Sequence, residues 1–194
     1  MKREIHNIFK ENRPTPFKYP PILEVYDDFI PSLIMDKLEN LIYQTPFFYQ
    51  KNITHNLSSS SNKDITFSKR LFDDLDQYVS SSLFSFLEPL YFFLIQKNIV
   101  INTISQARVF LQPPSLNPEI LDIHIDQFNP HMVFLYYIND SEGDTYFYNH
   151  EGEVIKQVSP KKGRFMWFDG SYYHCGSKPE SNTRAILNIN LTIK

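Results

Sequence analysis

The stretch that decides the fold is TYFYNHEGEVIKQVSPKKGRFMWFDGSYYHCG, residues 145–176. Short runs of aromatic and β-branched residues alternate here with turn-forming groups that contain Gly152, Gly163 and Gly170. Such runs predict β-strands, and the glycine-containing groups predict the tight turns between them. We predict strands at residues 145–148, 154–157, 164–168 and 172–175.

The same pattern of short apolar runs separated by turn residues continues on both sides of this stretch. Four more strands are predicted, at residues 105–111, 121–127, 132–139 and 184–193. Short strands separated by turn signals, without an internal repeat, are typical of a β-sandwich or jelly roll. We therefore expect a mainly β (α+β) fold, a double-stranded β-helix (jelly roll) with N-terminal helices packed on one sheet.

The N-terminal half is organised differently. Prolines predict an irregular arm over residues 1–21. A short strand is predicted at 22–26, helices at 32–43 and 71–87 and from Pro89 to about residue 97. Residues 47–70 contain the polar run at 58–63 and predict a mobile loop, interpreted equally well as a lid or as a surface excursion. We expect one domain over residues 22–194: helical support and a lid loop at 22–101, and a jelly-roll core at 102–194.

Composition excludes several classes of protein. The chain has 194 residues, 42% of them hydrophobic, which suits a globular core rather than a disordered chain. Its single cysteine excludes an internal disulfide framework, and a net charge of −3 gives no reason to expect nucleic acid. The most apolar stretch, residues 83–100, is interrupted by polar residues and proline, so we expect no membrane partner. With no recognisable targeting signal, the expectation is a cytoplasmic protein (host cytoplasm if viral).

Two histidines and an aspartate have the spacing of a metal site. His124 and Asp126 are alternate residues of a predicted strand, so their side chains point to one face and both can reach one ion. His174 lies on the penultimate predicted strand, which a jelly roll can bring beside the first. Two histidines and one carboxylate form the facial triad of non-haem Fe(II) oxygenases, which leaves open positions on the metal.

Arg184 follows His174 by ten residues and begins the last predicted strand. The rest of that strand is mostly apolar or amide-bearing, so the arginine has no evident local partner. Its planar guanidinium matches a carboxylate in a two-point contact. We therefore expect Arg184 to bind an anion.

Residues 124–194 resemble the 2-oxoglutarate/Fe(II)-dependent dioxygenases, in particular the prolyl 4-hydroxylase-like branch, including its small viral and bacterial members. That family carries a His-x-Asp pair, a distal histidine and a basic residue about ten positions later, in this order. Four further segments agree with it: LYYIN at 135–139, GDTYF at 143–147, GRFMWF at 163–168 and GSKP at 176–179.

The resemblance implies a role for each of these residues. His124, Asp126 and His174 would hold Fe(II), while Arg184 and the Tyr137 hydroxyl would bind the far carboxylate of 2-oxoglutarate. With O2, the reaction would give succinate and CO2 and hydroxylate an unidentified substrate, a prolyl or other protein residue or a small molecule. Asp126 is retained here, whereas halogenating relatives lose this carboxylate, so hydroxylation is the expected outcome.

Two further residues are candidates for the cofactor site. Asn188 shares a strand face with Arg184 and is placed to hydrogen-bond near the iron; Arg108 could add a donor to cosubstrate or substrate. An ordinary barrel contact or a surface pair explains both equally well. His131, five residues after Asp126, is interpreted as a packed residue rather than a fourth ligand.

Other functions remain compatible with these residues. One is a non-catalytic jelly-roll binding module, or a decayed oxygenase, that recognises a partner through its aromatic-rich loop. A zinc hydrolase on a similar barrel is a weaker alternative. The substrate and the oligomeric state stay open.

Overall fold

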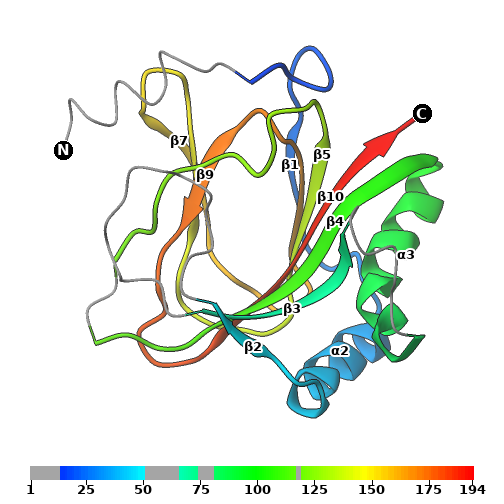
Figure 1. Cartoon of the computed structure of the whole chain (residues 1–194), viewed down its shortest axis with the longest axis vertical. Helices are drawn as coiled ribbons and strands as arrows, with labels where there is room; N and C mark the ends of the chain where they lie inside the picture. Colours follow the sequence, from blue (N-terminus) through cyan, green and yellow to red (C-terminus); the bar gives the residue numbers. More distant parts are fainter. Residues whose placement is uncertain (1–13, 51–65, 74–80, 117–118) are drawn as a thin grey trace.

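The computed structural model describes residues 14–50, 66–73, 81–116 and 119–194, which form two antiparallel sheets facing each other (Figure 1). The large sheet has seven strands in the order β1-β8-β5-β10-β4-β3-β2, and the small sheet has three in the order β7-β6-β9. The large-sheet strands are β1 (Leu23–Tyr26), β2 (Phe48–Gln50), β3 (Thr66–Asp73), β4 (Ile101–Gln112), β5 (Met132–Tyr137), β8 (Phe165–Asp169) and β10 (Arg184–Ile193). The small-sheet strands are β6 (Thr145–Tyr148), β7 (Val154–Val158) and β9 (Tyr173–Gly176). This is the predicted jelly roll, in which the sheets enclose an interior lined by alternate residues.

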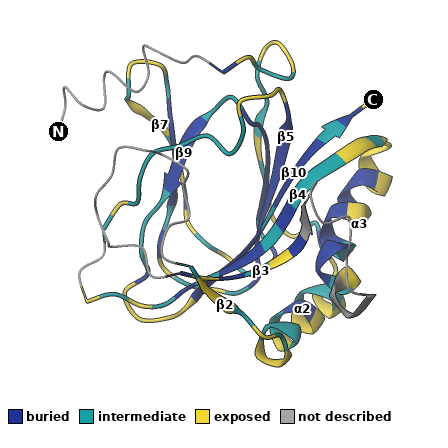
Figure 2. Ribbon diagram, in the orientation of Figure 1, coloured by how far each residue is buried: buried dark blue, intermediate teal, exposed yellow. Residues whose placement is uncertain are grey.

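Alternation along β5 and β10 separates the inside of the barrel from its outside. On β10, Leu187 and Ile189 face outward into the larger apolar core, while Ile186 faces inward with Tyr137 and Leu135 of β5. Both strands are almost wholly buried (Figure 2). Their side chains therefore have apolar surroundings on one face and line the site on the other.

Three helical segments cover the outer face of the large sheet: α2 (Ser32–Gln44), the 3-10 helix η1 (Ser81–Leu87) and α3 (Glu88–Lys97) (Figure 1). Helix α2 begins directly after Pro31, whose fixed φ suits a helix entry. Leu38 of α2 and Phe93 of α3 are completely or almost completely buried in the outer core. Phe93 lies against Phe165 and Trp167 of β8, which anchors α3 to the sheet.

Three sequence predictions are wrong in part. Residues 71–73 belong to strand β3, not to a helix over 71–87, and residues 81–87 form a 3-10 helix. The ends of the predicted loop over 47–70 are strands β2 and β3, because both pair into the large sheet. Residues 121–127 make only an isolated bridge, between His124 and His174, instead of a strand. Residues 1–13 of the predicted arm and the polar run at 58–63 lie outside the described residues.

None of the helices in the described part of the chain is both long and apolar enough to cross a membrane.

Candidate active site

The structure brings together the three residues with metal-ligand spacing. The Asp126 Oδ1 atom lies 3.7 Å from His124 Nε2 and 3.9 Å from His174 Nε2, and one ligand atom from each residue lies within 4.8 Å of the others. Donor atoms bonded to one transition-metal ion at about 2.1 Å are at most about 4.2 Å apart. The carboxylate oxygen is therefore already at the spacing that a shared ion requires.

Backbone pairing explains how residues far apart in sequence meet. His174 lies on β9, and the His124 N–H and carbonyl both bond to the His174 backbone at 2.9 Å. Their imidazole centroids lie 4.7 Å apart. Asp126 follows after the bridge, where the chain bends, so its side chain reaches the same place without a regular strand.

Both histidines are oriented by their own backbone. His124 Nδ1 lies 2.9 Å from the Asp122 carbonyl oxygen, and His174 Nδ1 lies 3.1 Å from that of Tyr172. A carbonyl oxygen only accepts, so each Nδ1 donates, and in the neutral ring Nε2 is the atom that carries the lone pair. Since Nε2 is the atom near Asp126, both rings present a metal-binding atom to the site.

The electrostatics of the cluster keep His174 and Asp126 deprotonated. Burial lowers the pKa of His174 to about 4, and repulsion from His124 acts in the same direction. Burial alone would raise the pKa of Asp126, but His174, His124 and a hydrogen bond from Asn188 together hold it below its usual value. At neutral pH, His174 is neutral and Asp126 is ionised, which are the forms that bind metals.

Asn188 supports the carboxylate from the neighbouring wall of the barrel. Its Nδ2 donates to Asp126 Oδ2 at 3.1 Å, leaving Oδ1 toward the two histidines. Two imidazole nitrogens and one carboxylate oxygen form a donor set that suits Fe(II). The residues present therefore fit the non-haem iron that the sequence resemblance implies.

Arg184 is buried in the barrel, with 2% of its surface exposed. Nη1 donates to Gln112 Oε1 at 2.6 Å and Nη2 donates to Thr145 Oγ1 at 2.8 Å. Nε is buried and has no hydrogen-bond partner, and within the described part of the chain no carboxylate pairs with the guanidinium. A buried cation held only by neutral groups is costly, so this arrangement is suited to binding an anion.

Tyr137 belongs to the same network. Its hydroxyl lies 3.1 Å from the Val158 carbonyl oxygen and 2.7 Å from Thr145 Oγ1. The carbonyl must accept from Tyr137, and Thr145 already accepts from Arg184, so the Thr145 hydroxyl proton points to the Tyr137 oxygen. The Arg184 guanidinium also lies 5.4 Å from the Tyr137 ring centre. This network fixes the arginine for a carboxylate partner.

Gln112 and Thr145 could not be predicted as site residues, since no sequence motif marks either of them. Alternation would have placed Thr145 on one face of its strand with Phe147, but only the tertiary structure shows that this face meets Arg184. Arg108 lies opposite Asn188 on β4. Its role in cofactor binding stays a prediction.

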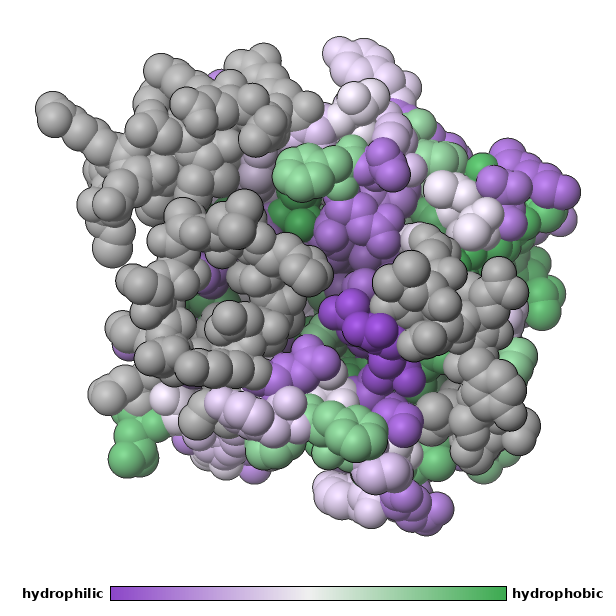
Figure 3. Space-filling model, viewed as in Figure 1, coloured by the Kyte–Doolittle hydropathy of each residue, from purple (hydrophilic) through white to green (hydrophobic). Residues whose placement is uncertain are grey.

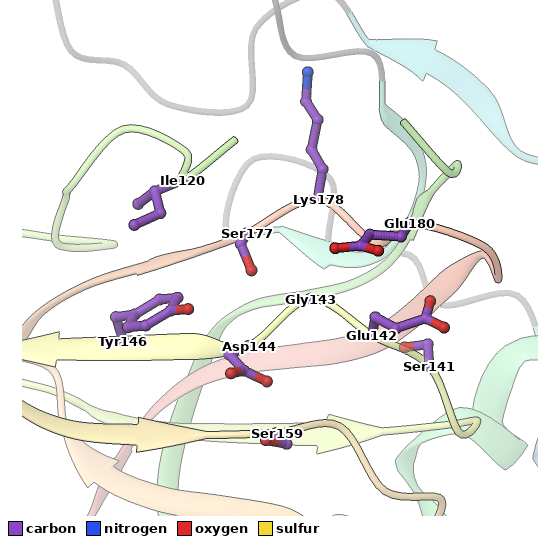
Figure 4. Close-up of a pocket in the computed structure, with 10 residues that line it drawn as sticks. All are labelled: Ile120, Ser141, Glu142, Gly143, Asp144, Tyr146, Ser159, Ser177, Lys178 and Glu180. Atoms are coloured by element: carbon purple, nitrogen blue, oxygen red, sulfur yellow. The ribbon is translucent and has the colours of Figure 1, made fainter. Parts of the chain in front are cut away.

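A surface pocket of about 470 Å³ lies near this region but is separate from it (Figure 4). It is lined by Asp144 and Tyr146, the residues on either side of Thr145, and by Glu142, Ser177 and Lys178. Thr145 faces the barrel interior, so its two neighbours face out. The pocket contains none of the metal-ligand candidates and is open to solvent, so it does not define the candidate active site.

Comparison with known proteins identifies the fold. The chain matches no protein-family model and no curated protein sequence. Its structure is similar to a 2OG-Fe(II) oxygenase family oxidoreductase from Burkholderia pseudomallei (TM-score 0.65, 11% identity, 98% of this chain and 90% of that one). It is similar to a prolyl hydroxylase from Trichoplax adhaerens solved with a hypoxia inducible factor peptide (TM-score 0.62, 17% identity, 98% and 88%). It is also similar to the viral collagen prolyl hydroxylase of Paramecium Bursaria Chlorella virus-1 in its 2OG complex (TM-score 0.56, 15% identity, 88% and 96%).

The chain therefore has the fold of the 2OG-Fe(II) oxygenases, including their prolyl hydroxylases. At identities this low, the similarity shows the fold, and the chemistry has to be argued from the residues of this chain.

Proposed function

We propose that the chain is a 2-oxoglutarate- and Fe(II)-dependent oxygenase that hydroxylates a substrate beside His124, Asp126 and His174. One observation carries this proposal: a His–Asp–His cluster and a buried arginine without a described carboxylate partner occur inside the same barrel. A metal alone would explain the cluster. Only a second, anionic ligand explains Arg184.

The chain would hold the metal through three atoms and leave the remaining positions open. His124 and His174 contribute Nε2, and Asp126 contributes Oδ1 while Asn188 holds its other oxygen. When bound, Fe(II) and 2-oxoglutarate supply the O2 chemistry, in which oxidative decarboxylation to succinate and CO2 is coupled to hydroxylation. The protein residues provide position, charge balance and a dry interior.

Arg184 would bind the carboxylate of 2-oxoglutarate that lies away from the metal. Its free Nε gives the pocket a buried, positively charged end. Thr145 accepts from Arg184 and donates to Tyr137, which donates to the Val158 carbonyl, so these two residues hold the guanidinium in position. The burial makes each charge-assisted bond stronger than it would be in water. The proposed substrate is a residue of a protein, prolyl or other, by extension from the neighbour solved with a peptide, or a small molecule.

The test measures both ligands and turnover. Protein purified without oxygen is loaded with Fe(II), 2-oxoglutarate binding is measured by calorimetry, and succinate is measured after O2 is admitted. Asp126→Ala removes a metal ligand, and Asp36→Ala is the matched control because this carboxylate lies on helix α2 and pairs with Lys162.

We expect wild type and Asp36→Ala to bind both ligands and release succinate, and Asp126→Ala to release none. Wild-type protein that binds neither Fe(II) nor 2-oxoglutarate would contradict the proposal in favour of a non-catalytic module.

A further inference from the structure

A buried amide in the barrel wall has no partner that the structure describes. Asn190 of β10 has 0% of its surface exposed, and neither its Nδ2 nor its Oδ1 makes a hydrogen bond. A buried polar group left unpaired costs about 1–3 kcal/mol, and most such groups in proteins are satisfied. Two unsatisfied atoms on one side chain therefore indicate that something outside the described chain satisfies them.

The position of Asn190 places this amide near the proposed metal site. Asn188 and Asn190 are alternate residues of β10, so they share the inner face and their Cα atoms are about 7 Å apart. Asn188 is the residue that bonds to Asp126. The Asn188 Oδ1 atom is also buried without a partner, so the unpaired polar atoms extend from the metal ligands along the wall.

His131 adds a third polar side chain to this wall. It precedes β5, and alternation places it on the inner face with Val133, the residue paired with Asn190. It is 2% exposed, and its ring occupies the space of a side chain at Gly170, where an added Cβ would lie 2.2 Å from its Nε2. Diagonal neighbours on adjacent strands are about 7–8 Å apart, which puts His131 within reach of a ligand at Asn190.

The protons of His131 follow from its contacts. Its Nδ1 lies 2.7 Å from the Asn129 carbonyl oxygen and so carries the proton. Its Nε2 is then an acceptor, and Nε2 is buried with no partner. The wall offers three buried, unpaired acceptors, from His131, Asn188 and Asn190, and one unpaired donor, the Asn190 N–H₂.

We propose that His131, Asn188 and Asn190 form a subsite that binds a primary carboxamide of the substrate. Its carbonyl would accept from the Asn190 N–H₂, one of its N–H groups would donate to Asn190 Oδ1, and the other would donate to His131 Nε2 or Asn188 Oδ1. This inference rests on the proposed function, because it places the carboxamide beside the group to be hydroxylated. A carboxamide supplies two N–H donors and one acceptor, which complements the wall better than a group with acceptors only.

A neutral group fits this position better than a cation. The carboxylate nearest the wall, Asp126, is already bonded to Asn188 and would be neutralised by a bound metal ion. Ser105 donates to the Asn190 backbone carbonyl and pairs with Gln127, the residue after Asp126. The Gln127 amide is half-buried and donates to Ser105 Oγ at 2.9 Å, so this pair holds the Asn190 backbone and leaves its side chain unpaired.

The test follows the Asn190 side chain directly. The full ¹⁵N-labelled protein is titrated with acetamide, and with acetone and methylammonium as matched probes that lack the N–H₂ or add a charge. The Asn190 N–H₂ resonance is identified by its loss in Asn190→Leu; Asn182→Leu, an exposed position, is the control substitution. Binding of Mn(II) and 2-oxoglutarate is measured in the same samples.

We expect acetamide alone to shift the Asn190 resonance in a saturable way, in the wild type and in Asn182→Leu. Asn190→Leu should retain or raise the melting temperature, because it removes an unpaired buried amide. The inference would be overturned if acetone gave an equal shift, if only methylammonium gave a shift, or if no probe shifted the resonance. It would also be overturned if Asn190→Leu lowered the melting temperature by several degrees. Binding of the metal and of 2-oxoglutarate is measured separately from binding of acetamide. If both ligands bind but acetamide does not shift the Asn190 resonance, the subsite is refuted and the proposed function stands. If acetamide shifts the resonance but neither ligand binds, the proposed function is refuted instead.

Discussion

Replacing Arg184 tests the cosubstrate pocket most directly. The variant Arg184→Met keeps a long side chain but removes the guanidinium that is bonded to Gln112 and Thr145. Hydrogen bonds to a charged group contribute about 1.5–3 kcal/mol each, so two bonds to a carboxylate are worth at least about 3 kcal/mol. At about 1.4 kcal/mol per factor of ten, 2-oxoglutarate affinity should fall about 100-fold or more.

The same variant should leave the metal site intact. The hydrogen bonds of Arg184 go to Gln112 and Thr145 and not to the metal-ligand candidates, so Mn(II) or Fe(II) affinity should change by less than about two-fold. Calorimetry of 2-oxoglutarate binding to the Mn(II)-loaded protein measures the first quantity, and a metal titration measures the second. The apparent KM for 2-oxoglutarate should rise in parallel.

Arg164→Met is the matched control for this experiment. Arg164 precedes β8, is partly exposed and makes a two-point pair with Asp27, at 2.8 Å for each bond. Its removal should not change 2-oxoglutarate affinity. Equal affinities in wild type and Arg184→Met would refute the assignment of Arg184 to the cosubstrate, and equal losses in both arginine variants would show that the effect is not local.

Three further outcomes are expected. Asn188→Leu removes the hydrogen bond to Asp126, so metal affinity should fall about 10-fold or more in a Mn(II) titration, and unchanged affinity would exclude this support. Gly170→Ala would force a Cβ to within 2.2 Å of the His131 ring, so thermal unfolding should show a loss of about 1–3 kcal/mol; an unchanged melting temperature would mean that the ring moves freely. Unfolding of the metal-free protein should become easier as the pH falls from about 6.5 to about 4, because the His174 pKa is about 4 in the folded protein and unfolded His174 takes up a proton first. The slope in denaturant titrations across this pH range should become smaller in His174→Asn, and an identical slope would assign the effect to other groups.

Strands marked by turn chemistry could be predicted from the sequence with the correct bounds. Residues 145–148 and 184–193 form β6 and β10 as predicted, because glycine turns and β-branched runs act locally. The helix predicted for residues 71–73 is wrong because their apolar spacing suits a helix as well as a strand. Only their pairing with β4 makes them a strand. Such long-range pairing is not visible in a single sequence.

The candidate site shows the same division. The His-x-Asp spacing identified His124 and Asp126 although residues 121–127 are not a regular strand, because one isolated bridge to His174 is enough to bring the rings together. Asn188 could be predicted as a site residue because alternate residues of a strand share a face, and it lies four residues after Arg184. Gln112 and Thr145 could not be predicted in this way, since their hydrogen bonds to Arg184 depend on how strands β4, β6 and β10 are arranged in space.

The order of strands has a consequence for how the protein is made. Strand β10 is the last in the chain, yet it lies in the interior of the large sheet and pairs with both β4 and β5. Until the ribosome has released it, those two strands have open edges that face each other across a gap of one strand. The barrel therefore closes only when β10 has left the ribosome, and until then the chain carries unpaired edges that invite aggregation or chaperone binding.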